Sequence, residues 1–214
     1  MSEINIIKVA TKGENLHLRV ATGHFASSNR HSNYYIDVVT QKARVSEAKA
    51  VAKELCSYYY ADTVVDTILC IDGTEVIGAY LADALAKADF ISMNAHKSIY
   101  VVTPEVTSGN LFLFRDNIIP MIEGKNVMIL GVSLTSGKTA EAAVDAVKYY
   151  GGTISGIASI FSTVEECAGL PVRSVFTPKD LDGYNSYKPH ECPMCKEDRK
   201  IDALVNCHGF SKLL

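Results

Sequence analysis

The stretch that decides the fold is VMILGVSLTSGKT, residues 127–139. It begins with an apolar run typical of a buried strand and leads through a hydroxyl-rich turn into a helical pattern. Gly137 lets the backbone approach an anion closely, and the helix N-terminus offers free N–H groups. The segment therefore predicts a phosphate-binding loop, with an ordinary turn that binds nothing as the alternative. Its binding residues would be Thr135, Ser136, Gly137, Lys138 and Thr139.

Strand and helix patterns alternate on both sides of this loop. Apolar runs predict strands at residues 67–71, 98–102, 127–130, 154–161 and 173–177. Amphipathic or alanine-rich stretches predict helices at residues 46–60, 75–87 and 139–150. Such alternation predicts an α/β fold in three layers, a mostly parallel central sheet with helices on both faces. Ligands in such folds bind at the carboxyl ends of the strands.

Length and composition favour one domain with additions. The 214 residues would divide into an N-terminal region at 1–45, a core at 46–179 and a polar extension at 180–214. A net charge of -3 argues against partners such as nucleic acid or a membrane surface. No signal peptide or membrane-spanning run is expected. Six dispersed cysteines do not resemble a disulfide framework, and they indicate the reducing cytoplasm.

A second glycine-bearing turn follows the strand predicted at 67–71. The segment IDGTEVIG, residues 71–78, places Gly73 and Gly78 around the start of a helix. Backbone N–H groups there can meet an anion, although an ordinary strand-to-helix turn is the alternative.

Four segments, in this order, resemble the type I phosphoribosyltransferases of the orotate phosphoribosyltransferase kind. They are GHFASSNRHSNYYID at 23–37, IDGTEVIG at 71–78, IEGKNV at 122–127, and the loop at 127–139. Together they lie within residues 20–165. The resemblance implies transfer of a 5-phosphoribosyl group from phosphoribosyl pyrophosphate to orotate or a related base.

The resemblance also implies roles for particular residues. Residues 1–45 would form a hood over the base, and Mg²⁺ and a homodimeric assembly would accompany the activity. The pyrophosphate loop would comprise Asp72, Gly73, Thr74, Glu75 and Gly78. The base would be contacted by Phe25, Tyr34 and Tyr35.

Two features depart from that family. Gly131 and Val132 stand where the family carries an acidic pair that binds the ribose hydroxyls. Residues 103–110, which match the family's mobile basic loop, contain no Lys, Arg or His. Positive charge for the leaving pyrophosphate would then have to come from His96, Lys97 or Arg115. The catalytic residues are thus unassigned, with Lys97 and Arg115 as candidates.

Two further functions stay open. A non-catalytic protein that binds phosphoribosyl pyrophosphate or a nucleotide on the same scaffold would need neither the acidic pair nor the basic loop. A P-loop ATPase is disfavoured, because Gly131 stands one place too early for that motif and residues 154–161 carry no Asp for magnesium.

The extension contains a separate pair of cysteines with metal-ligand spacing. Cys192 and Cys195 form a CxxC, and Cys207 and His208 could complete the four ligands that a structural zinc ion needs. His190 is also near in sequence. Two ordinary thiols are the alternative. A bound Zn²⁺ would fasten the polar extension to the core.

Overall fold

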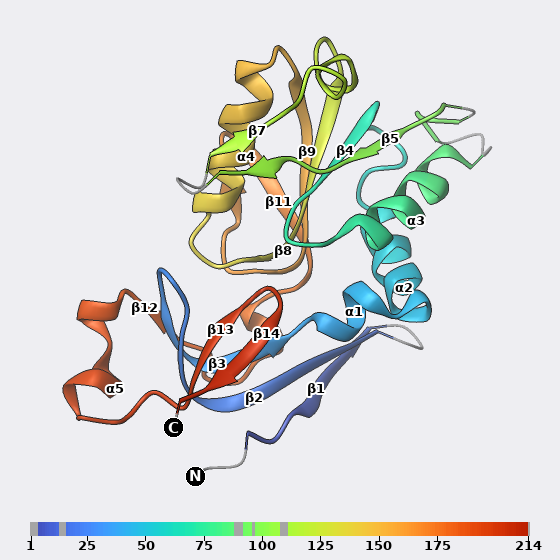
Figure 1. Ribbon diagram of the computed structural model, residues 1–214. Coiled ribbons are helices and arrows are strands. Elements are labelled where there is room, and N and C mark those ends of the chain that lie inside the picture. Colours follow the sequence, from blue (N-terminus) through green and yellow to red (C-terminus); the bar gives the residue numbers. More distant parts are fainter. Residues whose placement is uncertain (1–3, 13–15, 88–91, 96, 108–110, 214) are drawn as a thin grey trace.

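The computed structural model describes residues 4–12, 16–87, 92–95, 97–107 and 111–213. Two six-stranded sheets account for most of its strands, and they lie one below the other in Figure 1. We call them the core sheet and the hood sheet. Among the described residues, no helix combines the length and apolar character that crossing a membrane requires.

The core sheet has the strand order β10-β11-β9-β8-β4-β5. Its strands are β4 (Thr67–Cys70), β5 (Tyr100–Val102), β8 (Asn126–Leu134), β9 (Thr153–Ser162), β10 (Glu166–Cys167) and β11 (Leu170–Phe176). All neighbouring pairs are parallel except β10 with β11. The predicted mostly parallel sheet is therefore confirmed.

Helices cover both faces of the core sheet, because alternate residues of each strand point to opposite sides. Ile68 and Met128 pack in one cluster with α2 (Val45–Cys56) and α3 (Glu75–Ala86). Leu69 and Ile129 pack in the other cluster with α4 (Lys138–Tyr149). Figure 1 shows α4 on one side of the sheet and α2 with α3 on the other, which confirms the three layers.

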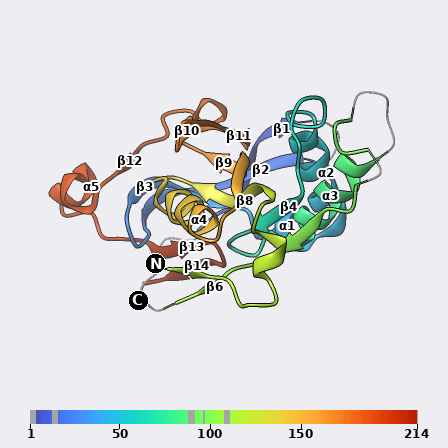
Figure 2. The same cartoon turned by 90° about the horizontal axis from the view of Figure 1, so that it is seen from above.

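The hood sheet joins both ends of the described chain. Its strands are β1 (Ile7–Lys12), β2 (Leu16–Ala26), β3 (His31–Asp37), β12 (Ser186–Tyr187), β13 (Ala203–Asn206) and β14 (Gly209–Lys212). The polar extension thus supplies strands to the hood sheet, where the sequence suggested an appendage on the core. In Figure 2 its short helix α5 (Pro193–Lys196) lies at the far end of the molecule from α2 and α3.

Shorter elements connect the two sheets. Helix α1 (Val39–Ala43) leads from β3 into α2, and the hairpin of β6 (Glu105–Val106) and β7 (Phe112–Leu113) follows β5. The 3-10 helices are η1 (Ile119–Met121), η2 (Pro178–Asp180) and η3 (Pro189–Glu191). A two-pronged ion pair also ties the hood to the core. Arg19 of β2 donates to both carboxylate oxygens of Glu47 of α2, at 2.6 and 2.7 Å.

Close packing of α3 on β4 generates a stability prediction. A Cβ added at Gly78 would lie 2.4 Å from the Cys70 sulfur, so Gly78→Ala should lower the free energy of unfolding by about 1–3 kcal/mol. Urea unfolding would measure this. In a Cys70→Ala background the sulfur is gone, and the same change should be neutral or stabilising. An equal loss in both backgrounds would contradict the packing explanation.

Candidate functional site

The predicted phosphate loop connects β8 to α4 in the conformation that its glycine allows. Gly137 is the N-cap of α4 with a φ of 75°, a left-handed value that favours glycine. The hydroxyl of Thr163 donates to the Thr135 carbonyl at 2.9 Å, and the Thr163 N–H donates to the Leu134 carbonyl at 3.0 Å. These bonds tie the loop to Thr163, just after β9. The loop leads into the first turn of a twelve-residue helix, and the N–H groups of a first turn lack helical acceptors.

The predicted pyrophosphate loop follows β4, the strand beside β8. Asp72 and Gly73 have φ values of 61° and 81°, which turn the chain sharply before α3. The buried hydroxyl of Thr74 lies 3.0 Å from the Ile71 carbonyl and 2.9 Å from the Leu130 carbonyl. Thr74 therefore holds this loop against β8. Glu75 is exposed in the first turn of α3.

Gly78 lies in a packed helix–strand contact and not in the exposed turn expected for an anion-binding residue. It lies within α3 and faces β4, where the Cys70 sulfur fills the space of a side chain. Its small size serves the packing of α3, and its helical N–H donates to the Thr74 carbonyl at 2.8 Å.

Lys42 of α1 brings a positive charge to the pyrophosphate loop, and the sequence patterns gave no signal for it. Its side chain is buried, with 9% of the residue exposed. Its ammonium donates to the carbonyls of Asp72 and Cys207, each at 2.7 Å. A Cβ added at Gly73 would lie 3.2 Å from the same nitrogen. The tip of the β13–β14 hairpin, residues 207–208, therefore meets this loop through Lys42.

Burial dominates the electrostatics of Asp72. It raises the pKa of the carboxyl above the ordinary value, while Lys42, His208 and a hydrogen bond with Cys207 act in the opposite direction. Cys207 and His208 are thus neighbours of the pyrophosphate loop.

Lys97 and Arg115, the two catalytic candidates from the sequence, each pair with a carboxylate outside the two loops. Lys97 lies 3.7 Å from Asp66, which precedes β4 and accepts a hydrogen bond from the N–H of Asn126 at the start of β8. Lys97 is therefore at the amino edge of the core sheet, opposite the two loops. Arg115 follows β7 and donates to both oxygens of Glu105, at 2.7 and 2.8 Å. His96 and residues 108–110 lie outside the described residues.

Apolar packing occupies the positions of the missing acidic pair. Val132 is 1% exposed and belongs to the cluster beneath α2 and α3. A Cβ at Gly131 would lie 3.2 Å from a methyl group of Leu134 and 3.4 Å from a methyl group of Ile71. An acidic side chain at either position would enter hydrocarbon, which is costly for a charged group.

The proposed base-contacting aromatics lie on opposite faces of the hood sheet. Phe25 and Tyr35 are buried together, with ring centroids 6.0 Å apart, and Tyr35 also packs on Phe210 of β14. Tyr34 is partly exposed, and its hydroxyl donates to the Asp182 carbonyl at 2.8 Å. With Arg199 it lines a surface hollow of about 340 Å³.

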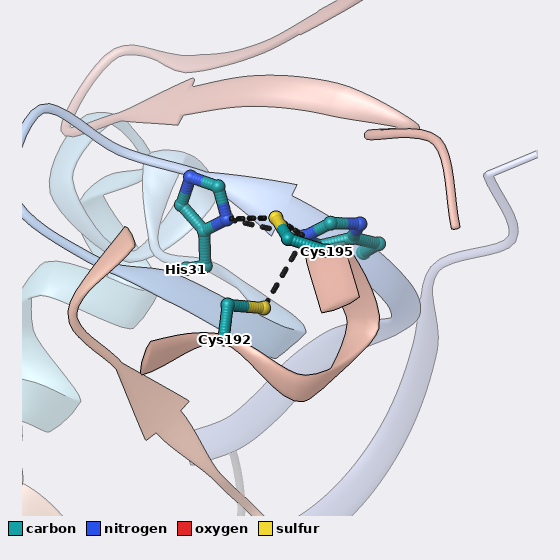
Figure 3. A group of neighbouring side chains, drawn as sticks. His31, Cys192 and Cys195 are labelled. Carbon is teal, nitrogen blue, oxygen red and sulfur yellow. Dashed lines mark hydrogen bonds between the residues drawn. The ribbon is translucent and has the colours of Figure 1, made fainter. Parts of the chain in front are cut away.

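The CxxC meets two histidines from the hood sheet. The possible ligand atoms of His24, His31, Cys192 and Cys195 all lie within 4.8 Å of one another. Figure 3 shows His31, Cys192 and Cys195 facing each other. This set keeps the two cysteines expected from the sequence but takes His24 and His31 in place of Cys207 and His208, which lie beside Asp72. A CxxC alone does not indicate which distant histidines it will meet.

Known proteins resemble the chain in sequence and in fold. The orotate phosphoribosyltransferase of Sulfurimonas denitrificans is 30% identical over 186 residues, 81% of this chain and 86% of the relative. That of Wolinella succinogenes is 28% identical over 217 residues, covering 94% and 96%. The Mycobacterium tuberculosis orotate phosphoribosyltransferase bound to phosphoribosyl pyrophosphate superposes with a TM-score of 0.52 at 18% identity, over 69% of this chain and 82% of that one. No family-level sequence profile matches the chain.

The structural similarity shows that the chain has the phosphoribosyltransferase fold. The sequence similarity is more specific. The chain belongs to the type I phosphoribosyltransferase family, as an orotate phosphoribosyltransferase-like member.

The raised pKa of Asp72 generates a prediction about pH. A carboxyl whose pKa is higher in the folded than in the unfolded chain makes the protein more stable as the pH falls through that pKa towards about 4. Asp72→Asn removes the buried charge, and Asn tolerates the left-handed backbone. The variant should therefore exceed the wild type in stability at pH 7, with a difference that shrinks near pH 4. Urea unfolding across this range would test it, and a pH-independent difference would contradict it.

Proposed function

We propose that the chain transfers a 5-phosphoribosyl group from phosphoribosyl pyrophosphate to orotate or a related base, with release of pyrophosphate. The observation that carries this proposal is the pair of neighbouring loops after β4 and β8, tied together by Thr74. In this proposal the 5-phosphate lies on residues 135–139 and the pyrophosphate on residues 72–75. The likeness to a structure solved with phosphoribosyl pyrophosphate supports the choice of donor.

Lys42 is the cation that we assign to the pyrophosphate side. Two of its three N–H groups are used by loop carbonyls, which fixes the ammonium beside Gly73 while its charge remains available to an anion. A charge held on hydrogen-bonded carbonyls needs little rearrangement when substrate binds.

Magnesium would accompany the donor. When bound, Mg²⁺ would neutralise part of the negative charge of the pyrophosphate. Asp72 and Glu75 are the protein carboxylates of this loop, whereas Gly131 and Val132 offer no side-chain oxygen. The remaining ligands would be phosphate oxygens and water, as Mg²⁺ commonly uses. A homodimer in the cytoplasm is also part of the proposal, on the family resemblance and the cysteine pattern.

A non-catalytic binding protein is the second candidate function. The buried Val132 and the apolar surroundings of Gly131 favour it, because neither residue offers a side-chain group for the ribose hydroxyls. The proposed phosphate loop does not depend on either side chain. Binding without turnover is what this candidate predicts.

Activity and binding measured together distinguish the two candidates. We expect the protein to release pyrophosphate from phosphoribosyl pyrophosphate when orotate and Mg²⁺ are present, with calorimetry reporting donor binding in parallel. Binding without turnover on orotate, uracil or purine bases would favour the second candidate, and absence of both would overturn the two.

A pair of glycines offers a matched control for the binding site in that experiment. Gly137 and Gly124 have φ values of 75° and 65°, so an alanine at either costs a similar strain of about 1–2 kcal/mol. Gly137→Ala should weaken donor binding, because it distorts the phosphate loop. Gly124→Ala, with nothing within 4 Å of its added Cβ, should not. Equal affinities would contradict the placement of the 5-phosphate.

The role of Lys42 can be tested against the cation suggested by the sequence. Lys42→Met should weaken binding of the magnesium–donor complex by about 10- to 100-fold, which corresponds to one charged hydrogen bond. Lys97→Met should leave the dissociation constant unchanged, because Lys97 lies at the opposite edge of the sheet. Urea unfolding would confirm that both variants are folded. The reverse ranking would restore Lys97 as the candidate.

A further inference from the structure

We propose that His24, His31, Cys192 and Cys195 bind one structural Zn²⁺ ion that fastens residues 192–202 to the hood sheet. His24 lies on β2 and His31 begins β3, whereas Cys192 precedes α5 and Cys195 lies within it. The ion would therefore join segments that are more than 160 residues apart in sequence. This site is separate from the two loops after β4 and β8.

Four distances between these ligand atoms lie close to the edges of a zinc tetrahedron, and the remaining two are below 4.8 Å. Zinc bonds of about 2.0–2.1 Å to nitrogen and about 2.3 Å to sulfur give edges of about 3.3 Å between nitrogens and about 3.6 Å between nitrogen and sulfur. His24 Nε2 lies 3.2 Å from His31 Nδ1 and 3.6 Å from each cysteine sulfur. The Cys195 sulfur lies 3.2 Å from His31 Nδ1.

Hydrogen bonding alone does not account for this arrangement. The other nitrogen of His24, Nδ1, lies 2.8 Å from the Arg199 carbonyl, which can only accept, so Nδ1 carries the proton. The Nε2 atom of a neutral His24 then presents a single lone pair. Three neighbours approach that lone pair, and one acceptor position cannot satisfy all of them. A cation at the common centre satisfies all four atoms at once.

The hydrogen bond from His24 Nδ1 to the Arg199 carbonyl is typical of a zinc-binding histidine. Ligating imidazoles commonly donate their second N–H to a carbonyl, which fixes the ring orientation. The same segment holds the backbone of His24 on both sides. The His24 N–H donates to the Asp202 carboxylate at 2.7 Å, and the Asp202 N–H donates to the His24 carbonyl at 2.8 Å.

Burial and charge favour zinc over a cluster of free thiols. His24 and Cys192 are fully buried, and His31 is 8% exposed. Zinc binding releases the two thiol protons to solvent, and two thiolates then balance the double charge of the ion. The site as a whole is neutral, which suits a largely buried position in which only Cys195 of the four residues is partly exposed.

The ion would also help to position the β13–β14 hairpin, which follows residues 192–202 in the chain. The chain runs from Cys195 through Arg199 and Asp202 directly into β13, and the hairpin tip at Cys207 accepts the hydrogen bond of Lys42. Anchoring residues 192–202 therefore fixes where the tip meets the pyrophosphate loop. This consequence rests on the proposed function, whereas metal binding itself does not.

Metal analysis of the full-length protein tests the proposal directly. Protein purified without added metal, and protein stripped with a chelator and reloaded with Zn²⁺, should each contain about one zinc per chain by mass spectrometry of the elements. Cys195→Ser and His31→Ala should each reduce that content by about tenfold. Cys207→Ser and His208→Ala are matched controls from the hairpin tip and should keep one zinc per chain.

Cobalt reports on the ligands in the wild-type protein, so the test does not depend on variants that fold poorly. Protein reloaded with Co²⁺ should show the intense visible bands of a tetrahedral site together with sulfur-to-cobalt charge transfer. Zinc loss in Cys207→Ser with retention in Cys195→Ser would overturn the proposed ligand set. A wild-type protein that takes up neither metal, or whose mass shows a Cys192–Cys195 disulfide under reducing purification, would overturn the zinc site itself.

Discussion

The parallel pairing of β4 with β8 is the constraint on which the rest of the structure depends. Cys70 lies opposite Leu130, and the N–H of Ile71 continues the pairing with a bond to the Leu130 carbonyl. Two strands that run in the same direction deliver their following loops to the same edge. Thr74 then uses its hydroxyl to hold the first loop on the second strand. The two loops that we propose to bind phosphate and pyrophosphate are neighbours for this reason.

Backbone and side chains contribute differently to the proposed site. The loops that we propose to bind anions would do so through main-chain N–H groups, which depend on turn geometry and a helix N-terminus. The acidic pair and the basic loop that the family resemblance implies are side-chain features, and this sequence lacks both. Hydrocarbon surrounds Gly131 and Val132, and the positive charge in our proposal comes from Lys42, a residue of the connection between hood and core.

Most of the core could be predicted from the sequence, because its parallel strands and its helices carry local apolar patterns, whereas the short strand β10 does not. The expected strand at 127–130 was too short, since the pairing with β9 continues as far as Leu134 opposite Ser162. Contacts between distant segments carried no local pattern. Neither the approach of Lys42 to Asp72 nor the meeting of His24 with Cys192 follows from spacing, and adjacent aromatics at 34 and 35 give no indication of which one is covered by the C-terminal hairpin.

The positions of the strands along the chain imply an order of folding during synthesis. Every strand of the core sheet lies between Thr67 and Phe176, so this sheet can assemble as soon as that stretch has left the ribosome. The hood sheet combines strands that begin at Ile7 with strands that end at Lys212. Its N-terminal strands are made first and must wait, partly unpaired, for the last ones to emerge. Those waiting strand edges are where a translating chain is most open to chaperones and to wrong pairing.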